Sequence, residues 1–144
     1  MIHVSRKYRF SASHRLHSEQ LSESENQRIY GKCNYPFGHG HNYELEIGVK
    51  GPVEAKSGRA VDTAALDRLV STEILEAFAY KNLNAEIPEF QNVVPTTENL
   101  GIEIHRRLNG KWRDVFPGQW PALDKVRIAE TSRNIFEVLE NGQK

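Results

Sequence analysis

Hydrophobic and polar residues alternate along two segments of the chain, 2–14 and 39–50. Positions 39, 41, 43, 45, 47 and 49 read His, His, Tyr, Leu, Ile and Val, whereas the positions between them are glycine or polar. In the first segment the residues in one phase, interrupted only by Arg6, are Ile2, Val4, Tyr8, Phe10, Ala12 and His14. Alternation with a period of two is typical of a strand with one buried and one solvated face. We therefore predict two β-strands whose inward faces both end in histidine.

Two later segments have helical periodicity. Asp62 is a suitable N-cap for a first helix, whose apolar stripe is Leu66, Leu69, Val70, Ile74 and Phe78. A second helix is predicted to begin near Thr96 or Thr97 and to stop at Gly110, with an apolar face of Leu100, Ile104 and Leu108. The segment 82–95 between them contains two prolines and is expected to be irregular.

Two further strands complete the predicted fold, after a loop over residues 111–121. Residues 123–131 and 135–140 have strand character, which gives the element order ββααββ. This order indicates the α+β class, with a four-stranded antiparallel sheet and two helices on one face. Because such a sheet has unpaired edges, we expect copies of the chain to pair into an oligomeric barrel.

The composition indicates one domain spanning residues 1–144. Its 19 basic and 19 acidic residues balance, which argues against nucleic acid or an anionic membrane as a partner. A single cysteine excludes an internal disulfide. Since no apolar run has the length of a signal peptide or a bilayer span, we expect a cytoplasmic protein.

Three histidines are the strongest candidates for metal binding. His39 and His41 point to the same side of their strand, and His14 ends the inward face of the neighbouring strand. Three imidazole nitrogens suit zinc, and three ligands with one open position are typical of a catalytic zinc site. The alternative is that these are ordinary strand histidines beside a glycine-rich turn.

Cys33, the only cysteine, lies six residues before His39 in a turn-rich stretch. Thiolate binds zinc strongly, so Cys33 is a candidate fourth ligand. It is also a candidate base or nucleophile, because Lys32 and a zinc ion would both favour its thiolate form. The third interpretation is a buried, inert cysteine.

Glu130 shares its strand phase with Val126 and Ile128, which predicts that its carboxylate points into a buried region. A buried carboxylate without a partner is costly. Its partner is therefore either an Arg or Lys side chain or a ligand with several N–H donors.

Several motifs together resemble the 6-pyruvoyltetrahydropterin synthase family over nearly the whole chain. In family order they are Phe10–His17, Tyr30–Asn34, Gly38–Tyr43, Lys81–Leu83, Thr96–Asn99 and Glu130–Thr131. The resemblance implies a ββααββ tunnelling fold (T-fold), trimers stacked into hexamers, and active sites where subunits meet.

The resemblance also implies roles for individual residues. The zinc ligands would be His14, His39 and His41, with Cys33 as catalytic base and Glu130 as the carboxylate that anchors the pterin ring. The pocket lining would include Thr96, Thr97 and Glu98. The implied reaction converts 7,8-dihydroneopterin triphosphate to 6-pyruvoyltetrahydropterin with loss of triphosphate.

One departure from the family pattern concerns proton transfer. Family members usually have aspartate and histidine immediately before the Lys-Asn-Leu motif, whereas this chain has Ala79 and Tyr80. Alanine cannot transfer a proton, and a tyrosine with an ordinary pKa near 10 is a poor base at neutral pH unless that pKa is strongly shifted. Tyr80 is therefore considered as a substitute acid. Three outcomes are open: slow or partial synthase activity, a different reaction on a related pterin, or pterin binding without turnover. The related 6-carboxytetrahydropterin synthase is the alternative enzyme.

Overall fold

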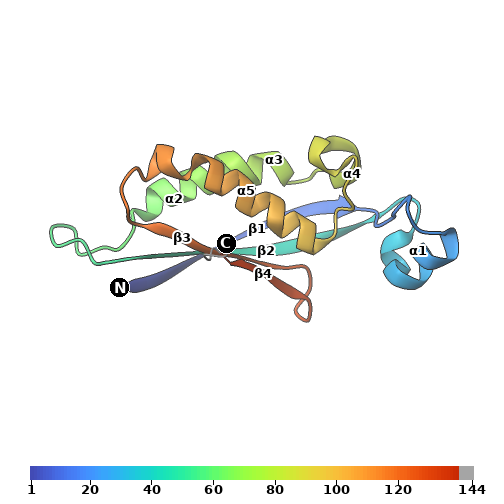
Figure 1. The fold of residues 1–144 in the computed structure, drawn as a ribbon, viewed down its shortest axis with the longest axis horizontal. Helices are drawn as coiled ribbons and strands as arrows, with labels where there is room; N and C mark the ends of the chain where they lie inside the picture. The colour runs from blue at the N-terminus through green and yellow to red at the C-terminus, as the bar shows by residue number, and fades with distance from the viewer. Residues whose placement is uncertain (140–144) are drawn as a thin grey trace.

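A four-stranded antiparallel sheet forms one layer of the structure, and helices cover one of its faces (Figure 1). The computed structural model describes residues 1–139 of the 144-residue chain. The strands lie side by side in chain order, as β1 (Ile2–His14), β2 (His39–Gly51), β3 (Ala122–Ala129) and β4 (Ile135–Leu139). The predicted α+β class and antiparallel sheet are confirmed. Glu140, expected at the end of the last strand, lies outside the described residues.

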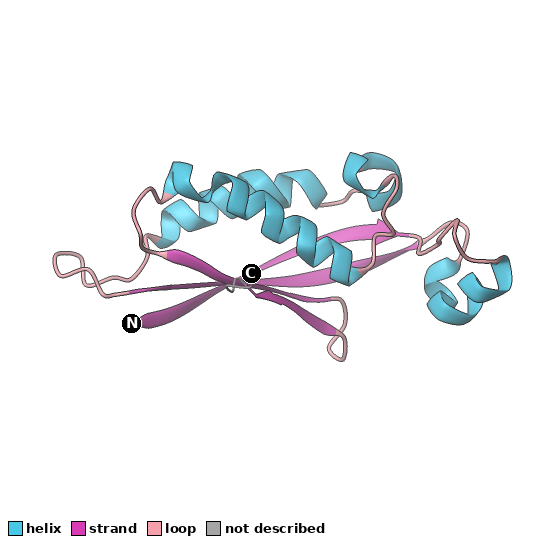
Figure 2. Ribbon diagram, in the orientation of Figure 1, coloured by secondary structure: helices cyan, strands magenta, loops and turns pink. Residues whose placement is uncertain are grey.

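Two long helical segments form the second layer (Figure 2). The first runs from Thr63 to Phe78 as α2 (Thr63–Val70), a π-helical turn η2 (Ser71–Leu75) and α3 (Glu76–Phe78). Asp62 caps it, because its carboxylate accepts the Ala65 N–H at 3.1 Å. The second is α5 (Thr97–Val115), which begins where the sequence predicts. Between them, α4 (Leu83–Glu86) and the 3₁₀ turn η3 (Pro88–Phe90) occupy the segment expected to be irregular.

The prediction that Gly110 ends the second helix is wrong. α5 continues to Val115, so part of the segment expected to be a loop is helical. Trp112 follows Leu108 on the buried face and is only 7% exposed, and its indole N–H donates to the Pro121 carbonyl at 3.0 Å. A glycine inside a helix costs about 1 kcal/mol, which is less than the stabilisation of roughly 2 kcal/mol or more from burying a large apolar side chain.

A short helix, α1 (Glu23–Tyr30), lies beyond one end of the sheet (Figure 1). Ser22 and Glu25 form a reciprocal capping box at its start, which is a signal that the sequence carries. The 3₁₀ turn η1 (Gly31–Asn34) follows and leads into β2. This segment between the two long strands positions Cys33 next to the start of β2.

Arg6 does not break the inward face of β1. Its guanidinium donates to the Asp67 carboxylate of α2, with Nε at 3.1 Å from Oδ1. The Tyr8 hydroxyl donates to the same oxygen at 2.6 Å. The positive charge of Arg6 is therefore neutralised between sheet and helix.

Of the helices in the described part of the chain, none is both long enough and apolar enough to cross a membrane.

Candidate metal and catalytic site

The pairing of β1 with β2 brings the three histidines together. His14 lies opposite His39 in the antiparallel register, and Ala12 lies opposite His41. The Nε2 atoms of His39 and His41 are 2.8 Å apart. With the Cys33 sulfur, the candidate ligand atoms of these residues all lie within 4.8 Å of one another. We refer to His14, Cys33, His39 and His41 as the His-Cys cluster.

His14 is held in one orientation by contacts on the side away from the cluster. Its side chain is almost fully buried, and its Nδ1 lies 2.9 Å from the Pro95 carbonyl oxygen. Because a carbonyl only accepts hydrogen bonds, Nδ1 carries the proton and Nε2 presents a lone pair to the cluster. Burial, together with the charge of His41, lowers the pKa of His14 to about 4. At neutral pH this imidazole is therefore neutral, which is the form that binds a metal.

Cys33 reaches the cluster from η1. Its sulfur lies 3.5 Å from His39 Nε2, and its carbonyl accepts the Leu16 N–H at 2.7 Å, which ties the turn to the end of β1. Burial, and then the charge of Glu130, raise the pKa of this thiol. The expected effect of Lys32 is absent: its side chain is exposed and is not among the groups that shift this pKa. A cation in the cluster is the group that would favour the thiolate.

The donor set of the cluster fits a metal ion. The buried His14 Nε2 has no hydrogen-bond partner within residues 1–139. An unpaired buried nitrogen is costly, and coordination would satisfy it. Three imidazoles and a thiol are ligands typical of zinc and other late transition metals, whereas magnesium and calcium prefer oxygen.

Glu130 lies at the edge of the cluster. The prediction that Glu130 lies within the strand is wrong, because β3 ends at Ala129 rather than at residue 131. The Glu130 N–H donates to the Asn134 carbonyl at 3.0 Å. Its Oε1 is 3.5 Å from His41 Nε2 and 3.8 Å from His14 Nε2. The side chain is 13% exposed, as the strand phase predicts. In the part of the chain that the structure describes, these imidazoles rather than an Arg or Lys are its potential cationic partners.

The Thr96–Glu98 segment begins α5 and contributes unequally to the site. Thr97 is buried and donates its hydroxyl to Glu130 Oε1 at 2.9 Å. Thr96 caps the helix by accepting the Asn99 N–H at 3.1 Å. Glu98 is exposed on the first turn and is not among the described residues that contact Glu130 or the cluster. The sequence did not distinguish these three roles.

Ala79 and Tyr80 follow α3 and lie beside the end of β1. Tyr80 is 89% exposed and is the only non-glycine residue of the described chain with positive φ, at 61°. Its N–H donates to the Ser11 carbonyl, which fixes the backbone. Ala79 packs against the core. Tyr80 and His41 line a common cavity of about 330 Å³, but among residues 1–139 no contact joins the phenol to Cys33.

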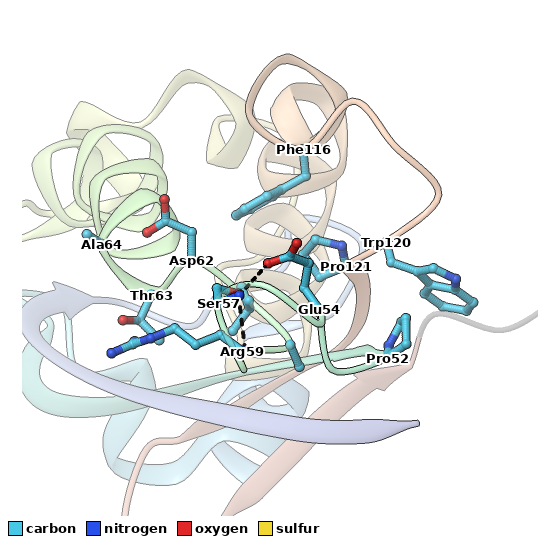
Figure 3. A pocket seen from close by; sticks show the side chains of 12 residues that line it. Pro52, Glu54, Ser57, Arg59, Asp62, Thr63, Ala64, Phe116, Trp120 and Pro121 are labelled. Carbon is cyan, nitrogen blue, oxygen red and sulfur yellow. Dashed lines mark hydrogen bonds between the residues drawn. The ribbon is translucent and has the colours of Figure 1, made fainter.

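A cavity larger than those beside His14 and His41 lies at the other end of the sheet (Figure 3). It has a volume of about 560 Å³ and is lined by the loop after β2, the start of α2, Phe116 and Trp120. β2 separates it from His39 by its full length of 13 residues, roughly 40 Å. None of the His-Cys cluster residues lines it. The size of a cavity therefore does not locate the candidate chemistry in this chain.

Known proteins resemble this chain in sequence and in fold. It is 41% identical over 132 residues to the human protein named 6-pyruvoyl tetrahydrobiopterin synthase, covering 92% of this chain and 87% of that one. It is 30% identical over 100 residues to a putative 6-carboxy-5,6,7,8-tetrahydropterin synthase of Archaeoglobus fulgidus, covering 69% and 74%. The solved structure of Caenorhabditis elegans 6-pyruvoyl tetrahydropterin synthase superposes with a TM-score of 0.86 at 37% identity, covering 97% and 96% of the two chains.

The family resemblance expected from the motifs is thus confirmed by the whole chain. The match to the family described as 6-pyruvoyl tetrahydropterin synthase spans residues 3–141, which includes every residue of the His-Cys cluster, Thr97 and Glu130. By this match and these relatives, the chain belongs to the 6-pyruvoyl tetrahydropterin synthase family.

Proposed function

We propose that this protein is a zinc-dependent lyase that converts 7,8-dihydroneopterin triphosphate to 6-pyruvoyltetrahydropterin with loss of triphosphate. The observation that carries the proposal is the placement of Glu130 beside the His-Cys cluster. A carboxylate acceptor for ring N–H groups and a set of metal-binding side chains occur within 4 Å of each other. One ligand with a pterin ring and a hydroxylated side chain would engage both.

The proposed zinc ligands are His14, His39 and His41. Zinc would act as a Lewis acid on the hydroxyls of the substrate side chain and so acidify the adjoining C–H bonds. The Pro95 carbonyl contributes by fixing the tautomer and ring orientation of His14. Three histidine ligands leave one coordination position for substrate, which is the arrangement of catalytic rather than structural zinc.

Cys33 is proposed as the base that takes the proton from the substrate side chain. Its sulfur is next to the ligand atoms, so the thiolate would lie close to the acidified carbon. Burial raises the pKa of the thiol, which keeps it protonated until a cation is bound. Because the thiolate would form only when a metal ion is bound, Cys33 would abstract a proton only in the protein that holds both metal and substrate.

Glu130 is proposed to orient the pterin. The Thr97 hydroxyl occupies one lone pair of Oε1 and restricts rotation of the carboxylate. The remaining lone pairs are available for N–H donors on the ring, and a carboxylate can accept two such bonds at once. The ring would then present its side chain to the metal.

The active site is proposed to be completed by a second copy of the chain. In the described residues, β1 and β4 are the outer strands of the sheet, so each presents an edge to a neighbouring subunit. The proposed assembly is a trimer or a hexamer in the cytoplasm. Tyr80, exposed at the end of α3, would then reach a site formed with its neighbour and act as the substitute acid.

The experiment that tests the function is product analysis by mass spectrometry after incubating zinc-loaded protein with 7,8-dihydroneopterin triphosphate. An Ala79→Asp, Tyr80→His double variant is the matched comparison. Formation of the pyruvoyl product by the native chain supports the proposal. Product from the double variant alone would assign the native chain to pterin binding without this turnover.

The absence of an acid–base pair at Ala79 and Tyr80 favours a second candidate, a reaction slower than that of typical family members. Loss of a general acid–base group typically costs on the order of 10²–10⁴ in rate. A carboxylated product would instead identify the 6-carboxytetrahydropterin synthase reaction. Product identity therefore separates the candidates without reference to rate.

A further inference from the structure

Tyr43 lies on the inward face of β2, two positions after His41 and on the same side of the sheet as the His-Cys cluster. It is fully buried, and its ring stacks on Phe10 with the ring centroids 5.2 Å apart. A phenylalanine ring could make the same contact, whereas a hydroxyl buried without hydrogen bonds is costly. The partners of the hydroxyl therefore indicate what a tyrosine adds at this position.

One partner of the Tyr43 hydroxyl is the imidazole of His14. The phenolic oxygen lies 3.3 Å from His14 Nδ1, the nitrogen that faces away from the His-Cys cluster. Because Nδ1 carries the proton that it donates to the Pro95 carbonyl, the Tyr43 oxygen is a second acceptor for the same N–H. The imidazole is thus held from two elements, and the hydroxyl proton of Tyr43 remains available for another acceptor.

The other partner is Thr97, at the start of α5. Burial, and then the charges of Glu130 and Cys33, raise the pKa of the Tyr43 hydroxyl, whereas its hydrogen bond with Thr97 lowers this pKa. The phenol therefore keeps its proton at neutral pH. Since Thr97 donates its single hydroxyl proton to Glu130 Oε1 at 2.9 Å, the Thr97 oxygen accepts the proton of Tyr43.

These contacts form one directed chain of hydrogen bonds. The His14 N–H donates to Tyr43, and the Tyr43 hydroxyl donates to Thr97. The Thr97 hydroxyl donates in turn to the carboxylate of Glu130, which is a strong acceptor because it is charged. His14, Tyr43 and Thr97 are each at most 3% exposed, so water does not replace a lost link. Hydrogen bonds in such a chain polarise one another, and the loss of one weakens the rest.

We propose that Tyr43 is a positioning residue that links the metal ligand His14 to the pterin-binding carboxylate of Glu130. The inference rests on the proposed function for the roles of these two partners. The chain fixes the imidazole and the carboxylate in one relative orientation, so a single ligand can meet both without rearrangement of the site. Tyr43 acts through His14 and Thr97 rather than on the substrate.

The first test compares the native protein with Tyr43→Phe, which removes only the hydroxyl. Tyr8→Phe is the matched control, because the Tyr8 hydroxyl is on the inward face of β1 and donates to Asp67 instead of a member of the chain. We expect Tyr43→Phe to lower zinc affinity roughly tenfold and to alter the visible absorption spectrum of the cobalt(II)-loaded protein, since His14 is less firmly oriented.

The control variant should have a lower Tm and native metal binding. Native zinc affinity in Tyr43→Phe would overturn the proposal. An equal loss of zinc affinity in Tyr8→Phe would mean that any lost hydroxyl loosens the sheet, which would also overturn it.

The second test is a double-mutant cycle on the affinity for 7,8-dihydroneopterin, measured by calorimetric titration at saturating zinc. Tyr43→Phe and Thr97→Val should each weaken binding roughly tenfold. Because both break the same chain, the double variant should also bind roughly tenfold more weakly than the native protein, rather than about 100-fold. Losses that multiply would mean that the two hydroxyls act independently and would contradict the link.

Both tests measure binding, so they separate the role of Tyr43 from the proposed reaction. Non-additive losses of pterin affinity in a protein that forms no pyruvoyl product would retain the positioning role and reject the lyase reaction. Native product formation by Tyr43→Phe, with native affinities for zinc and pterin, would retain the reaction and reject the role of Tyr43. Absence of zinc binding by the native protein would reject both.

Discussion

Asp67 and Glu130 are both carboxylates on the helix-covered side of the sheet, but their surroundings differ. Asp67 accepts hydrogen bonds from the Arg6 guanidinium and the Tyr8 hydroxyl, so its charge and its lone pairs are satisfied within the chain. Glu130 receives one hydroxyl, that of Thr97, and faces two imidazoles, of which His14 is neutral at neutral pH.

The comparison indicates that the Asp67 carboxylate has a structural role, whereas the Glu130 carboxylate is available to bind a ligand. In the Arg6–Asp67–Tyr8 group, the carboxylate compensates a charged residue on an inward strand face. The Glu130 region retains an unpaired imidazole nitrogen, a thiol and carboxylate lone pairs in one place. Buried polar groups without a partner in the chain are rare and occur mainly where a bound ligand or ion pairs with them.

The largest expected effect is loss of metal from the His-Cys cluster beside Glu130. His39→Ala should lower zinc affinity by more than about 100-fold and remove activity, because only two of the three proposed histidine ligands remain. Metal content by mass spectrometry and product formation are the measurements. His3→Ala, an exposed strand histidine paired with Asp124, is the matched control and should retain both. Full activity in metal-free His39→Ala would contradict the account.

The next effect distinguishes Cys33 as base from Cys33 as ligand. Cys33→Ala should retain zinc, held by the three histidines, and lose on the order of 10²–10⁴ in kcat. Metal content and single-turnover kinetics measure the two properties separately. Loss of zinc together with activity would instead make Cys33 the fourth ligand of a closed site.

A smaller effect is expected at the hydroxyl that supports Glu130. Thr97→Val keeps the shape of the side chain and removes the donor at 2.9 Å from Oε1. Pterin affinity should fall by roughly tenfold, because the carboxylate loses one hydrogen bond and becomes free to rotate. Fluorescence titration with a pterin measures this change. Thr96→Val, which removes only a helix cap, should lower stability and leave affinity unchanged.

The smallest effect is expected at Asp67. Asp67→Asn should lower Tm by about 1–3 °C and leave zinc content and activity unchanged, because the group is partly exposed and screened. The Arg6 hydrogen bond lowers the pKa of Asp67 in the folded protein, against the opposing effect of burial. Its contribution is therefore present above the unfolded pKa near 4 and is lost as the pH falls through the lower folded value.

Thermal unfolding between pH 3 and pH 7 checks this dependence. The difference in Tm between the native protein and Asp67→Asn should be constant near neutral pH and should shrink below about pH 4. A difference that grows on acidification would mean that the carboxylate is stabilised in its protonated form.

Strand alternation predicted the positions of the histidines because it is a local property. A period of two assigns His14, His39 and His41 to inward faces, and antiparallel pairing then brings the two strand ends together. The same local reasoning predicted that Glu130 points inward. Strand alternation did not predict the hydrogen bond between Arg6 and Asp67, because Asp67 lies on a helix 61 positions away in the sequence.

The details that define the site depend on contacts that no local pattern encodes. The carbonyl that fixes the His14 tautomer belongs to Pro95, 81 positions later. Thr97 contacts Glu130 only because α5 packs across the end of the sheet, and the neighbouring Thr96 and Glu98 do not share that role. The missed helix α1 is different, since Ser22 and Glu25 form a capping box that the sequence displays.

The central claim is that one ligand joins the metal of the His-Cys cluster to Glu130. The most direct measurement is a crystal structure of the protein with 7,8-dihydroneopterin, collected at the zinc absorption edge. The account predicts an anomalous peak bonded to His14 Nε2, His39 and His41, with ring N–H groups of the pterin on the Glu130 carboxylate. Zinc at the cluster with the pterin bound away from Glu130, or no zinc at the cluster, would contradict it.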